Sequence, residues 1–524
     1  MKTIQTSMNG YPVGQQDFKR LRENQLIYVD KTPFISKLIE AKYQYCFLSR
    51  PRRFGKSLFL STLEYFFKGE RKLFKGLYVD NIGWDWKEYP VLHLDLNTNR
   101  YENPGLLESV LDRLFREWEK KYDVDVKDSD YSQRFATIIK SAHNKTGLPV
   151  VILVDEYDKP LVGNLNKNDN FEHYRSQLAS LYSNFKSSAE HIRLVFLTGV
   201  SRFSKLSVFS DLNNIPDITF SDDFADICGI TEKELFSYFK KGIAELACRY
   251  AVSFEEASIL LKRNYDGYRF AETGNDIYNP WSLLNCLQNK RISNYWNETG
   301  VPTIVAESLK RIDADLEKVV NTRCSLKDLA GLDLTNPNPV ALMYQTGYLT
   351  IKNYDFPTDI VTLGMPNREV KQGLFEVLLP YYVNIHRGRV ESVVSDLILD
   401  ILDGNPEGFV DKLDVFLAGI PYDLSMENEN NMQNAIYILL TLIGIKTETE
   451  VHISDGRIDL IIKTDKFIYI IELKFDKCGE EAIEQIENKN YAYPYSHDPR
   501  KIFLIGVNFS SKTPHLDKPI IRSV

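Results

Sequence analysis

The run SRPRRFGKSLFLS, at residues 49–61, contains the residue types that bind nucleotide phosphates. It follows an apolar segment and opens a helical pattern, which is the context in which a phosphate-binding loop works. Backbone N–H groups at the helix N-terminus bind phosphate oxygens, a lysine reaches the terminal phosphates, and a hydroxyl binds Mg²⁺. The residues predicted to bind nucleotide are Arg53, Phe54, Gly55, Lys56, Ser57 and Leu58.

The loop departs from the full pattern, GxxxxGK followed by Ser or Thr, at its first glycine. Arg50 occupies that position and Pro51 follows it. The first glycine normally permits a tight turn out of the strand, so these two residues must form a similar loop with more restricted dihedral angles. A chance GKS at a helix start is therefore the alternative interpretation of this run on its own.

The apolar run LPVVILVDEYD, at residues 148–158, ends in acids that suit ATP hydrolysis. We expect Asp155 to hold Mg²⁺ through water and Glu156 to orient or deprotonate the attacking water. Thr198 ends the next strand and is placed to sense the γ-phosphate, and Arg202 follows as a charge stabiliser. A surface salt bridge is an equally good interpretation of Arg202. We expect Asp158 to be a solvated or capping acid.

A second group of residues, in GRIDLIIKTDKFIYIIELKFD at residues 456–476, suits metal-dependent phosphodiester chemistry. Side chains alternate along a strand, so Glu472 and Lys474 share one face, and Asp459 can join that face across the ladder. Carboxylates are hard ligands for Mg²⁺ or Mn²⁺, and the lysine can activate water or stabilise charge at phosphorus. The alternative, an exposed salt-bridged strand pair, is weakened because the preceding IYII predicts a buried strand.

The elements that must position these residues form two α/β patterns. From Tyr43 to Asp211, short apolar runs alternate with helical patterns, which predicts parallel strands joined by crossover helices in three layers. A helical stretch follows from Thr231 to Tyr295. Between Pro339 and Tyr382, a helix followed by a two-stranded wing is compatible with a winged-helix module. The last hundred residues or so form the second α/β pattern.

Composition excludes several classes of protein. The 524 residues include 64 Lys and Arg against 72 Asp and Glu, so no basic field covers the whole surface to hold nucleic acid indiscriminately. The six cysteines form no CxxC pair, which argues against a zinc site or a disulfide framework. No stretch approaches the roughly 18 apolar residues of a membrane span, and we expect a cytoplasmic protein without membrane association.

Six motifs of the N-terminal half, YVDKT, RPRRFGKS, VDEYDKP, TGVSRFS, YDGYRF and YNPWSLL, resemble those of the bacterial AAA-ATPase-like proteins. The resemblance extends from Gly10 to Leu284. It implies ATP binding by Lys56 and Ser57 and an acidic pair at Asp155 and Glu156. It also implies that an arginine in place of the first glycine, as at Arg50, is typical of the family. It assigns no role to Asp30, Lys31, Tyr265 or Asp266 in the motifs YVDKT and YDGYRF, and turn and packing roles are the default for these residues.

The C-terminal motifs GRID and IELK, with the helices around them, resemble the PD-(D/E)XK nuclease domain found at the C-terminus of the same family. The resemblance covers residues 429–510. It implies that Asp459 and Glu472 bind metal and that Lys474 is the catalytic lysine. Further residues implied in supporting roles are Glu429 on the preceding helix and Gln485 and Tyr491 on or near the following one, although the latter two are more widely spaced than the usual QxxxY.

These observations divide the chain into four predicted domains. They are an AAA-like P-loop ATPase core at 1–230, a helical lid with a module compatible with a winged helix at 231–388, a helical connector at 389–424, and a restriction-endonuclease-like α/β domain at 425–524.

The predicted function is a nuclease, dependent on Mg²⁺ or Mn²⁺, that acts on nucleic acid, with DNA preferred, under the control of ATP binding or hydrolysis. The resemblance to this family implies a role in phage defence or in the control of mobile elements. The alternative is a nucleotide-dependent switch or scaffold that binds nucleic acid or a protein partner without cleaving. A third hypothesis is a protein that senses nucleotide without hydrolysing it. The sequence is compatible both with a protein partner and with a homo-oligomer.

Overall fold

The computed structural model describes residues 10–98, 101–125, 130–164, 168–201, 215–296, 305–306, 308–309, 315–329, 338–383, 385–418, 429–447, 451–454, 457–475, 478–510 and 515–524. The chain forms two compact units. The N-terminal unit comprises Met1–Tyr295 and Arg323–Asn367, and the C-terminal unit comprises Trp296–Thr322 and Arg368–Val524. None of the helices in the described part of the chain is long and apolar enough to cross a membrane.

A parallel sheet of four strands forms the centre of the N-terminal unit. Its strands are β1 (Tyr45–Ser49), β2 (Val91–Asp95), β3 (Val150–Asp155) and β4 (Ile192–Gly199), in the order β1-β4-β3-β2. All six residues of β3 are buried, because helices cover both faces of the sheet. Beyond β1, an isolated parallel bridge joins Phe47 to Asp217. The predicted α/β class and parallel sheet are therefore confirmed.

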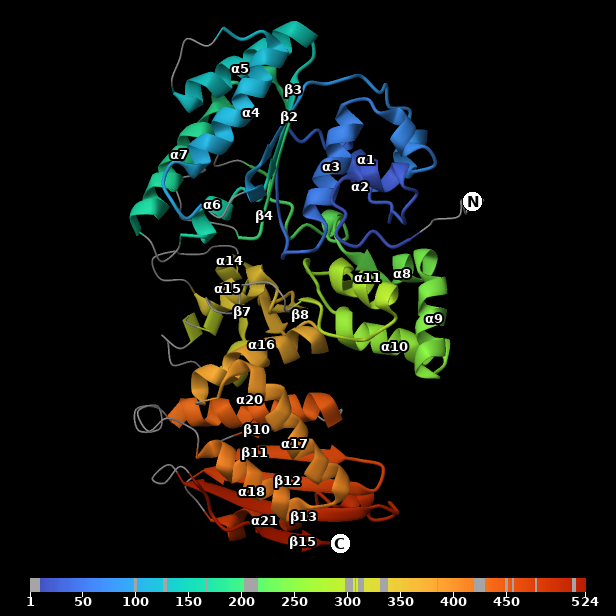
Figure 1. Cartoon of the computed structure of the whole chain (residues 1–524), viewed down its shortest axis with the longest axis vertical. Helices are drawn as coiled ribbons and strands as arrows, with labels where there is room; N and C mark the ends of the chain where they lie inside the picture. Colours follow the sequence, from blue (N-terminus) through green and yellow to red (C-terminus); the bar gives the residue numbers. More distant parts are fainter. Residues whose placement is uncertain are drawn as a thin grey trace. The chain divides into compact units, whose positions relative to one another are not determined.

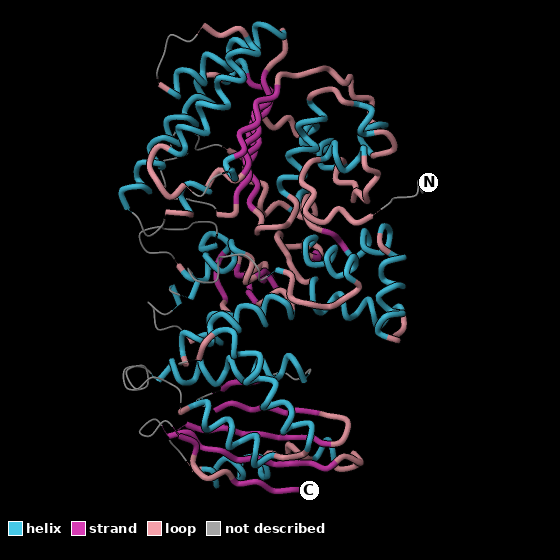
Figure 2. Tube along the Cα trace, viewed as in Figure 1, coloured by secondary structure: helices cyan, strands magenta, loops and turns pink. Residues whose placement is uncertain are grey.

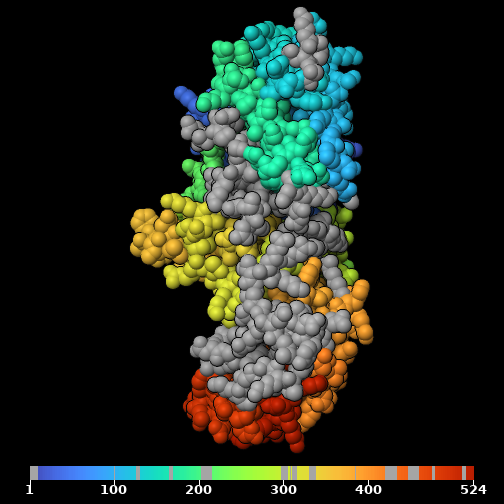
Figure 3. All heavy atoms as spheres, turned by 90° about the vertical axis from the view of Figure 1, so that its left-hand side faces the viewer, coloured from blue at the N-terminus to red at the C-terminus, as the bar shows by residue number. Residues whose placement is uncertain are grey.

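Two groups of helices cover the sheet, as Figures 1 and 2 show. The helices on one side are α1 (Phe18–Glu23), α2 (Pro33–Glu40) and α3 (Lys56–Phe67), and those on the other are α4 (Leu106–Tyr122), α5 (Tyr131–Thr146), α6 (Lys159–Val162) and α7 (Asn168–Ser187). Cyan to blue-green atoms of the second group cover much of the face of this unit that Figure 3 presents. Short 3₁₀ turns lie at Arg71–Phe74, Tyr78–Asn81, Leu96–Thr98, Ala189–His191 and Asp222–Phe224.

The helical stretch expected after the core is present, and we call it the lid. Its elements are β5 (Ile230–Thr231), α8 (Glu232–Tyr238), α9 (Lys240–Tyr250), α10 (Phe254–Tyr265), β6 (Ile277–Tyr278) and α11 (Pro280–Asn289). Capping boxes at Thr231 and Ser253 start α8 and α10. The Asn279 side chain caps α11, whose first residue is Pro280.

A three-stranded antiparallel sheet completes the N-terminal unit. It contains β7 (Arg323–Ser325), β8 (Thr350–Asp355) and β9 (Ile360–Gly364) in the order β7-β9-β8, together with α14 (Leu326–Leu329) and α15 (Pro339–Thr346). Gly347, with a φ of 89°, ends α15 in the left-handed conformation. The helix and wing expected from the sequence are therefore present, and the assignment to a winged-helix module stays a prediction.

The C-terminal unit contains a mixed sheet with the order β10-β11-β12-β13-β14, and β15 also pairs with β13. Among the strand pairs that the structure describes in this sheet, only β12–β13 is parallel. The strands are β10 (Val451–Ser454), β11 (Arg457–Lys463), β12 (Phe467–Phe475), β13 (Lys501–Ser510), β14 (His515–Leu516) and β15 (Ile520–Ser523). The helices are α13 (Leu316–Val320), α16 (Arg368–Tyr382), α17 (Val390–Asp403), α18 (Pro406–Leu417), α20 (Glu429–Thr447) and α21 (Gly479–Asn488), with 3₁₀ turns at Arg387–Arg389 and Tyr493–Tyr495.

Helix α21 packs closely on the parallel pair β12 and β13. The buried cluster between them consists of Ile468, Ile470, Ile483, Ile486, Ile502 and Leu504. A Cβ at Gly506 would lie 2.8 Å from the carbonyl oxygen of Gly479 and from the backbone nitrogen of Ile483. This glycine therefore permits the close approach of α21 to the sheet.

Candidate nucleotide and nuclease sites

The predicted phosphate loop connects β1 to α3. Its turn lies at Arg53, with a φ of 66°, and at Gly55, with a φ of 98°, which is the N-cap of α3. Position 50, where the common pattern has glycine, does not adopt a positive φ. The loop thus avoids the need for glycine at that point by placing its left-handed residues closer to the helix.

Arg50 anchors the loop to the segment that follows β4. Its guanidinium is buried and donates to the carbonyl oxygens of Ser49 (2.9 Å), Thr219 (2.8 Å) and Phe224 (3.2 Å). It also lies 4.3 Å from the ring centroid of Phe270. A buried cation that donates hydrogen bonds to several carbonyl oxygens fixes the backbone around it. The departure from the common sequence pattern therefore has a structural role.

Lys56, the first residue of α3, lies beneath the loop. Its Nζ donates to the carbonyl oxygens of Arg50 (2.9 Å) and Pro51 (3.2 Å) and lies 3.5 Å from Oε1 of Glu156. The lysine side chain is almost fully buried, with 3% exposed. The predicted phosphate-binding cation and the predicted water-orienting acid are therefore neighbours.

Three predicted residues, Ser57, Asp155 and Thr198, meet at the carboxyl ends of β3 and β4. The hydroxyl of Thr198 donates to Oδ1 of Asp155 at 2.7 Å, and Ser57 is a hydrogen-bond partner of the same carboxylate. Burial raises the pKa of Asp155, and the two hydroxyl hydrogen bonds partly offset this shift. A carboxylate and a hydroxyl beside a phosphate loop form an oxygen donor set that fits Mg²⁺.

Glu156 adopts a φ of 53°, which is uncommon for a residue with a side chain. The chain turns at this point, so the Glu156 side chain faces Lys56 while the backbone N–H of Tyr157 donates to the carbonyl oxygen of Thr198 at 2.9 Å. Such backbone strain costs on the order of 1–3 kcal/mol and is often found at functional sites.

The expectation that Asp158 is a solvated or capping acid is wrong. Asp158 is 1% exposed and accepts hydrogen bonds from the backbone N–H groups of Val200 (3.1 Å) and Ser201 (2.6 Å). It makes no side-chain cap to α6. Burial raises its pKa to about 7. A Cβ at Gly199 would lie 2.6 Å from the ring of Tyr157, so the turn after β3 packs directly against the end of β4. Arg202 lies outside the described residues.

Two residues of β2 near this site are not predicted by the motifs. The parallel register places Asp95 beside Asp155 at the ends of β2 and β3. Nδ1 of His93 donates to Oε2 of Glu64 in α3 at 2.8 Å. Although burial opposes it, the hydrogen bonds from His93 and Lys68 hold the pKa of Glu64 low, at about 2. The run VLHLD, another apolar strand ending in an acid, is the signal that could have indicated Asp95.

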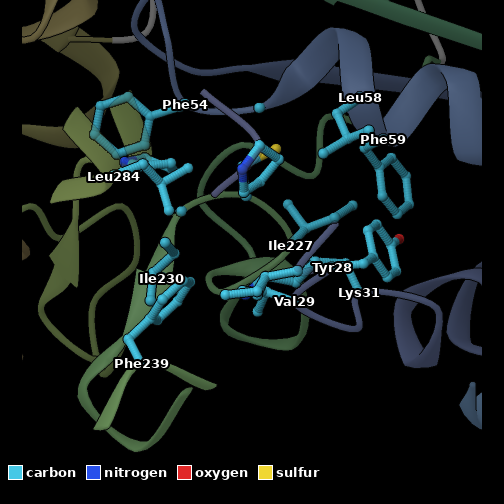
Figure 4. Close-up of a pocket in the computed structure, with 16 residues that line it drawn as sticks. Tyr28, Val29, Lys31, Phe54, Leu58, Phe59, Ile227, Ile230, Phe239 and Leu284 are labelled. Carbon is cyan, nitrogen blue, oxygen red and sulfur yellow. The ribbon is translucent and has the colours of Figure 1, made fainter. Parts of the chain in front are cut away.

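A pocket opens beside the phosphate loop. Its lining is mostly apolar, and Figure 4 shows Phe54, Leu58, Tyr28 and Ile230 around the same space. The residues come from the loop and α3 (Phe54, Gly55, Leu58, Phe59), the segment before α2 (Tyr28, Val29, Lys31), the segment 227–230, and the lid (Phe239, Pro280, Leu284), with Pro12 and Ile27 completing it. The loop and the pocket therefore share residues.

Lys31 of the YVDKT motif is held at this pocket by ionic contacts. Its Nζ lies 2.8 Å from both carboxylate oxygens of Glu234 and donates to the carbonyl oxygen of Asp226 at 2.8 Å. The side chain of Glu234 also forms the capping box of α8. Lys31 thus links the segment before α2 to the first helix of the lid.

In the C-terminal unit, the antiparallel register of β11 and β12 places Asp459 directly opposite Glu472. Glu472 is 1% exposed, and its Oε1 lies 3.9 Å from Nζ of Lys474. Lys474 donates to Oε1 of Gln485 in α21 at 2.7 Å. The alternation along β12 thus brings Glu472 and Lys474 to one face, and α21 adds the glutamine.

The other predicted nuclease residues have different positions. Glu429 is the first residue of α20, but its side chain, like that of Asp459, lies outside the described part of the structure. Tyr491 packs against the apolar cluster of α21 and the sheet. Asn508, which the motifs do not indicate, pairs with Lys474 in the β12–β13 register and donates to Asp517 at 2.6 Å.

A metal-binding cluster of three or more His, Cys, Asp or Glu residues is absent among the side chains that the structure describes. That set does not include Asp459 or Glu429. The strand register pairs the backbone positions of Asp459 and Glu472, and acids at these positions, with Lys474 two residues after Glu472, are residue types that suit Mg²⁺ or Mn²⁺.

Comparison with known proteins identifies two domains in the chain. The family model "Predicted AAA-ATPase" matches residues 12–209, and the model "PD-(D/E)XK nuclease superfamily" matches residues 427–518. The chain is 34% identical over 513 residues to a protein of Azotobacter chroococcum mcd 1 named "Uncharacterized protein in vnfD 5'region". The match covers 95% of this chain and 96% of that protein. No solved structure matches the chain.

The chain therefore belongs to the AAA-ATPase-like family and carries a C-terminal domain of the PD-(D/E)XK nuclease superfamily. Both resemblances recognised in the sequence are confirmed.

Proposed function

We propose that this protein binds and hydrolyses ATP and that its nucleotide state controls the cleavage of phosphodiester bonds in nucleic acid by the C-terminal domain. The observation that carries the proposal is the convergence of Lys56, Ser57, Asp155 and Thr198, from three separate parts of the sequence, beneath one phosphate loop. DNA is the proposed substrate, and defence against phage or control of mobile elements is the proposed setting.

The loop would bind the triphosphate through its backbone N–H groups and the Lys56 ammonium. Ser57 and Asp155 would hold Mg²⁺, which neutralises charge on the β- and γ-phosphates when it is bound. Glu156 is close enough to Lys56 to orient the water that attacks the γ-phosphate and to receive its proton. The apolar pocket that shares Gly55 and Leu58 with the loop would take the base of the nucleotide.

In the C-terminal domain, Asp459 and Glu472 would hold the divalent metal, which activates water and stabilises charge at phosphorus. Lys474 would hold a phosphate oxygen or the attacking water, because its ammonium lies on the same face as Glu472. Gln485 orients the Lys474 side chain through their hydrogen bond. Glu429 would support the metal or the water from α20.

One observation favours the second candidate, a switch or scaffold that binds without cleaving. Residues 425–524 contain 12 Lys and Arg against 15 Asp and Glu, so this domain gains little from the release of counterions on binding nucleic acid. A protein partner, or a second copy of the chain, would then be the main target of the nucleotide-dependent change.

Two assays on the purified full-length protein test the proposal. The first measures cleavage of labelled single- and double-stranded DNA and RNA with Mg²⁺ or Mn²⁺. We expect wild-type protein and Asp465→Ala, which alters an exposed acid in the β11–β12 turn, to cleave, and Asp459→Ala to be inactive. The second assay measures ATP binding and phosphate release. Absence of metal-dependent cleavage on every substrate would favour the switch or scaffold, and absence of nucleotide binding would overturn both.

A further inference from the structure

The chain passes between its two compact units at three peptide bonds, and two of them follow residues that are held beside the phosphate loop. The passages are Tyr295–Trp296, Thr322–Arg323 and Asn367–Arg368. We call Tyr295–Trp296 and Asn367–Arg368 the first and second crossings. The contacts described below all lie within the N-terminal unit.

The first crossing is held by an arginine of the phosphate loop. Nη1 of Arg53 donates to the carbonyl oxygen of Tyr295 at 3.0 Å. Nε1 of Trp281, the second residue of α11, donates to the same oxygen at 3.1 Å. The Arg53 guanidinium also stacks on the Trp281 ring, 4.1 Å from its centroid. One carbonyl group at the end of the N-terminal unit is therefore bound by the loop and by the lid together.

The residues before this crossing are fixed by Tyr265, the first tyrosine of YDGYRF. Its hydroxyl donates to the carbonyl oxygen of Ser293 and accepts from the backbone N–H of Ser293, at 2.9 and 3.0 Å. Its own carbonyl oxygen accepts from the N–H of Asn279, the cap of α11. Tyr265 therefore connects the segment before Tyr295 to the start of the helix that carries Trp281.

The second crossing is held by the next two residues of the same motif. The side-chain amide of Asn367 donates to the carbonyl oxygen of Asp266 at 2.8 Å. Nζ of Lys352 joins the carbonyl oxygens of Gly267 and Pro366, at 3.3 and 3.0 Å. Gly267 has a φ of 93°, and a Cβ there would lie 2.3 Å from the Pro366 carbonyl oxygen. This position requires glycine because the two backbone segments approach so closely.

The YDGYRF motif also touches the phosphate loop directly. The ring of Phe54 packs edge-on against Tyr268 and Phe270, with centroids 4.7 and 5.3 Å apart. All three rings are buried. The adjacent loop residues Arg53 and Phe54 therefore lead to different crossings, Arg53 through Trp281 to the first and Phe54 through the YDGY turn to the second.

We propose that Arg53 and Phe54 transmit the state of the phosphate loop, through Trp281 and the YDGY turn, to the two crossings, and so couple nucleotide binding to the C-terminal unit. This assigns positioning roles to two motifs, YDGYRF and YNPWSLL, that the sequence leaves without function. The inference rests on the proposed function, because it requires that the loop bind nucleotide.

The physical basis is the backbone of the loop. Binding a phosphate requires the N–H groups of residues 53–57 to converge on one anion. Arg53 has a left-handed φ of 66°. Because this conformation is sterically unfavourable for a residue with a side chain, a change to a negative φ has no steric cost. A change in this dihedral angle moves the guanidinium away from the Tyr295 carbonyl oxygen or towards it. Packed aromatic contacts such as Phe54–Tyr268 pass on a displacement because close-packed interiors deform little.

Hydrogen–deuterium exchange of the full-length protein, with and without Mg·ATP, tests the inference. The peptides to follow cover residues 291–296 and 364–368. The variants are Trp281→Leu for the first crossing and Asn367→Ala for the second. Gln288→Ala, an exposed position on α11, and Asn353→Ala, an exposed position on β8, are the matched controls. Affinity for a fluorescent ATP analogue is measured for every protein.

In the wild-type protein and both controls, we expect ATP to change exchange in both peptides. Trp281→Leu should bind the analogue as the wild type does but lose the response at 291–296, and Asn367→Ala should lose the response at 364–368. If Trp281→Leu does not fold, Trp281→Phe, which keeps a ring without the Nε1 donor, takes its place.

Three results would decide against the inference in distinguishable ways. A wild-type protein that binds the analogue without any change in either peptide overturns the inference and leaves ATP binding intact. Variants that keep the wild-type response also overturn it. A wild-type protein that does not bind nucleotide overturns the proposed function and this inference with it.

Discussion

The candidate nucleotide site is a loop held by side chains from distant parts of the chain, whereas the candidate nuclease site lies on a hairpin whose register follows from strand periodicity. Arg50 reaches carbonyl groups about 170 residues away, and Asp155 is bound by a threonine of another strand. Glu472 and Lys474, by contrast, are two positions apart on β12 and face Asp459 and Arg457 across one ladder. The first site therefore depends on tertiary packing and the second mainly on local geometry.

This difference predicts how each site responds to change. Substitutions around the nucleotide site should alter stability and activity together, because the same contacts support both. Substitutions around the nuclease site should separate the two, because the hairpin keeps its register without the catalytic side chains.

The largest effect should follow from removing the loop lysine. Lys56→Ala should reduce ATP hydrolysis by about 10²–10³-fold, the usual cost of losing one preorganised group that stabilises developing charge. Lys72→Ala, which removes an exposed lysine after α3, is the control and should hydrolyse ATP normally. Phosphate release under saturating ATP measures both. Hydrolysis by Lys56→Ala at the wild-type rate would exclude the loop as the catalytic site.

A smaller loss of activity should follow from removing the glutamine beside Lys474. Gln485→Ala should slow metal-dependent cleavage by roughly 10–100-fold, as expected when a group that orients a catalytic residue is lost. Its melting temperature should change little, because α21 is held by its apolar face. Tyr491→Phe, six residues further on, should retain activity. Equal losses in both variants would show that the loss of activity is not specific to the contact between Gln485 and Lys474.

Arg50 offers a test in which sequence pattern and structure disagree. Arg50→Gly restores the common phosphate-loop sequence, but it leaves several carbonyl groups without their buried donor. We expect the N-terminal unit to lose about 3 kcal/mol of unfolding free energy. Urea unfolding, with Arg52→Gly in the same loop as the control, measures the change. A variant as stable as the wild type would contradict the anchoring role.

The pH dependence of stability gives a further test. Burial raises the pKa of Asp158 from its usual 3.8 to about 7. The stability that its protonated form contributes is complete below about pH 4 and is lost as the pH rises through about 7. Asp158→Asn does not titrate, so its melting temperature relative to the wild type should rise between pH 4 and 7. A constant difference for Asp158→Asn would refute the assignment.

The parts of the fold that follow from short-range pattern were predictable from the sequence. Strand ends rich in acids and hydroxyls indicated Asp155 and Thr198 beside the loop, and the period of two placed Glu472 with Lys474. The role of Arg50 was not predictable, because its partners Thr219 and Phe224 are brought to it only by the folded chain. The four domain boundaries stay predictions.

Asp158 and Gln485 show two ways in which pattern misleads. A third acid two residues after Glu156 suggests a solvated side chain, yet the turn after β3 folds back onto β4 and buries Asp158 against two N–H donors. Gln485 is too far from Tyr491 for the usual motif, yet the close approach of α21 at Gly506 brings it to Lys474. In both cases the deciding contact lies between elements that are separate in sequence.

The central claim is that nucleotide in the first site controls chemistry at the second. The most direct test is the rate of metal-dependent cleavage of labelled DNA by the full-length protein, with and without ATP, in the wild type, in Lys56→Ala and in Lys72→Ala. The account predicts a rate that changes with ATP in the wild type and in Lys72→Ala but is the same with and without ATP in Lys56→Ala. Cleavage that responds to ATP equally in all three proteins, or in none of them, would contradict it.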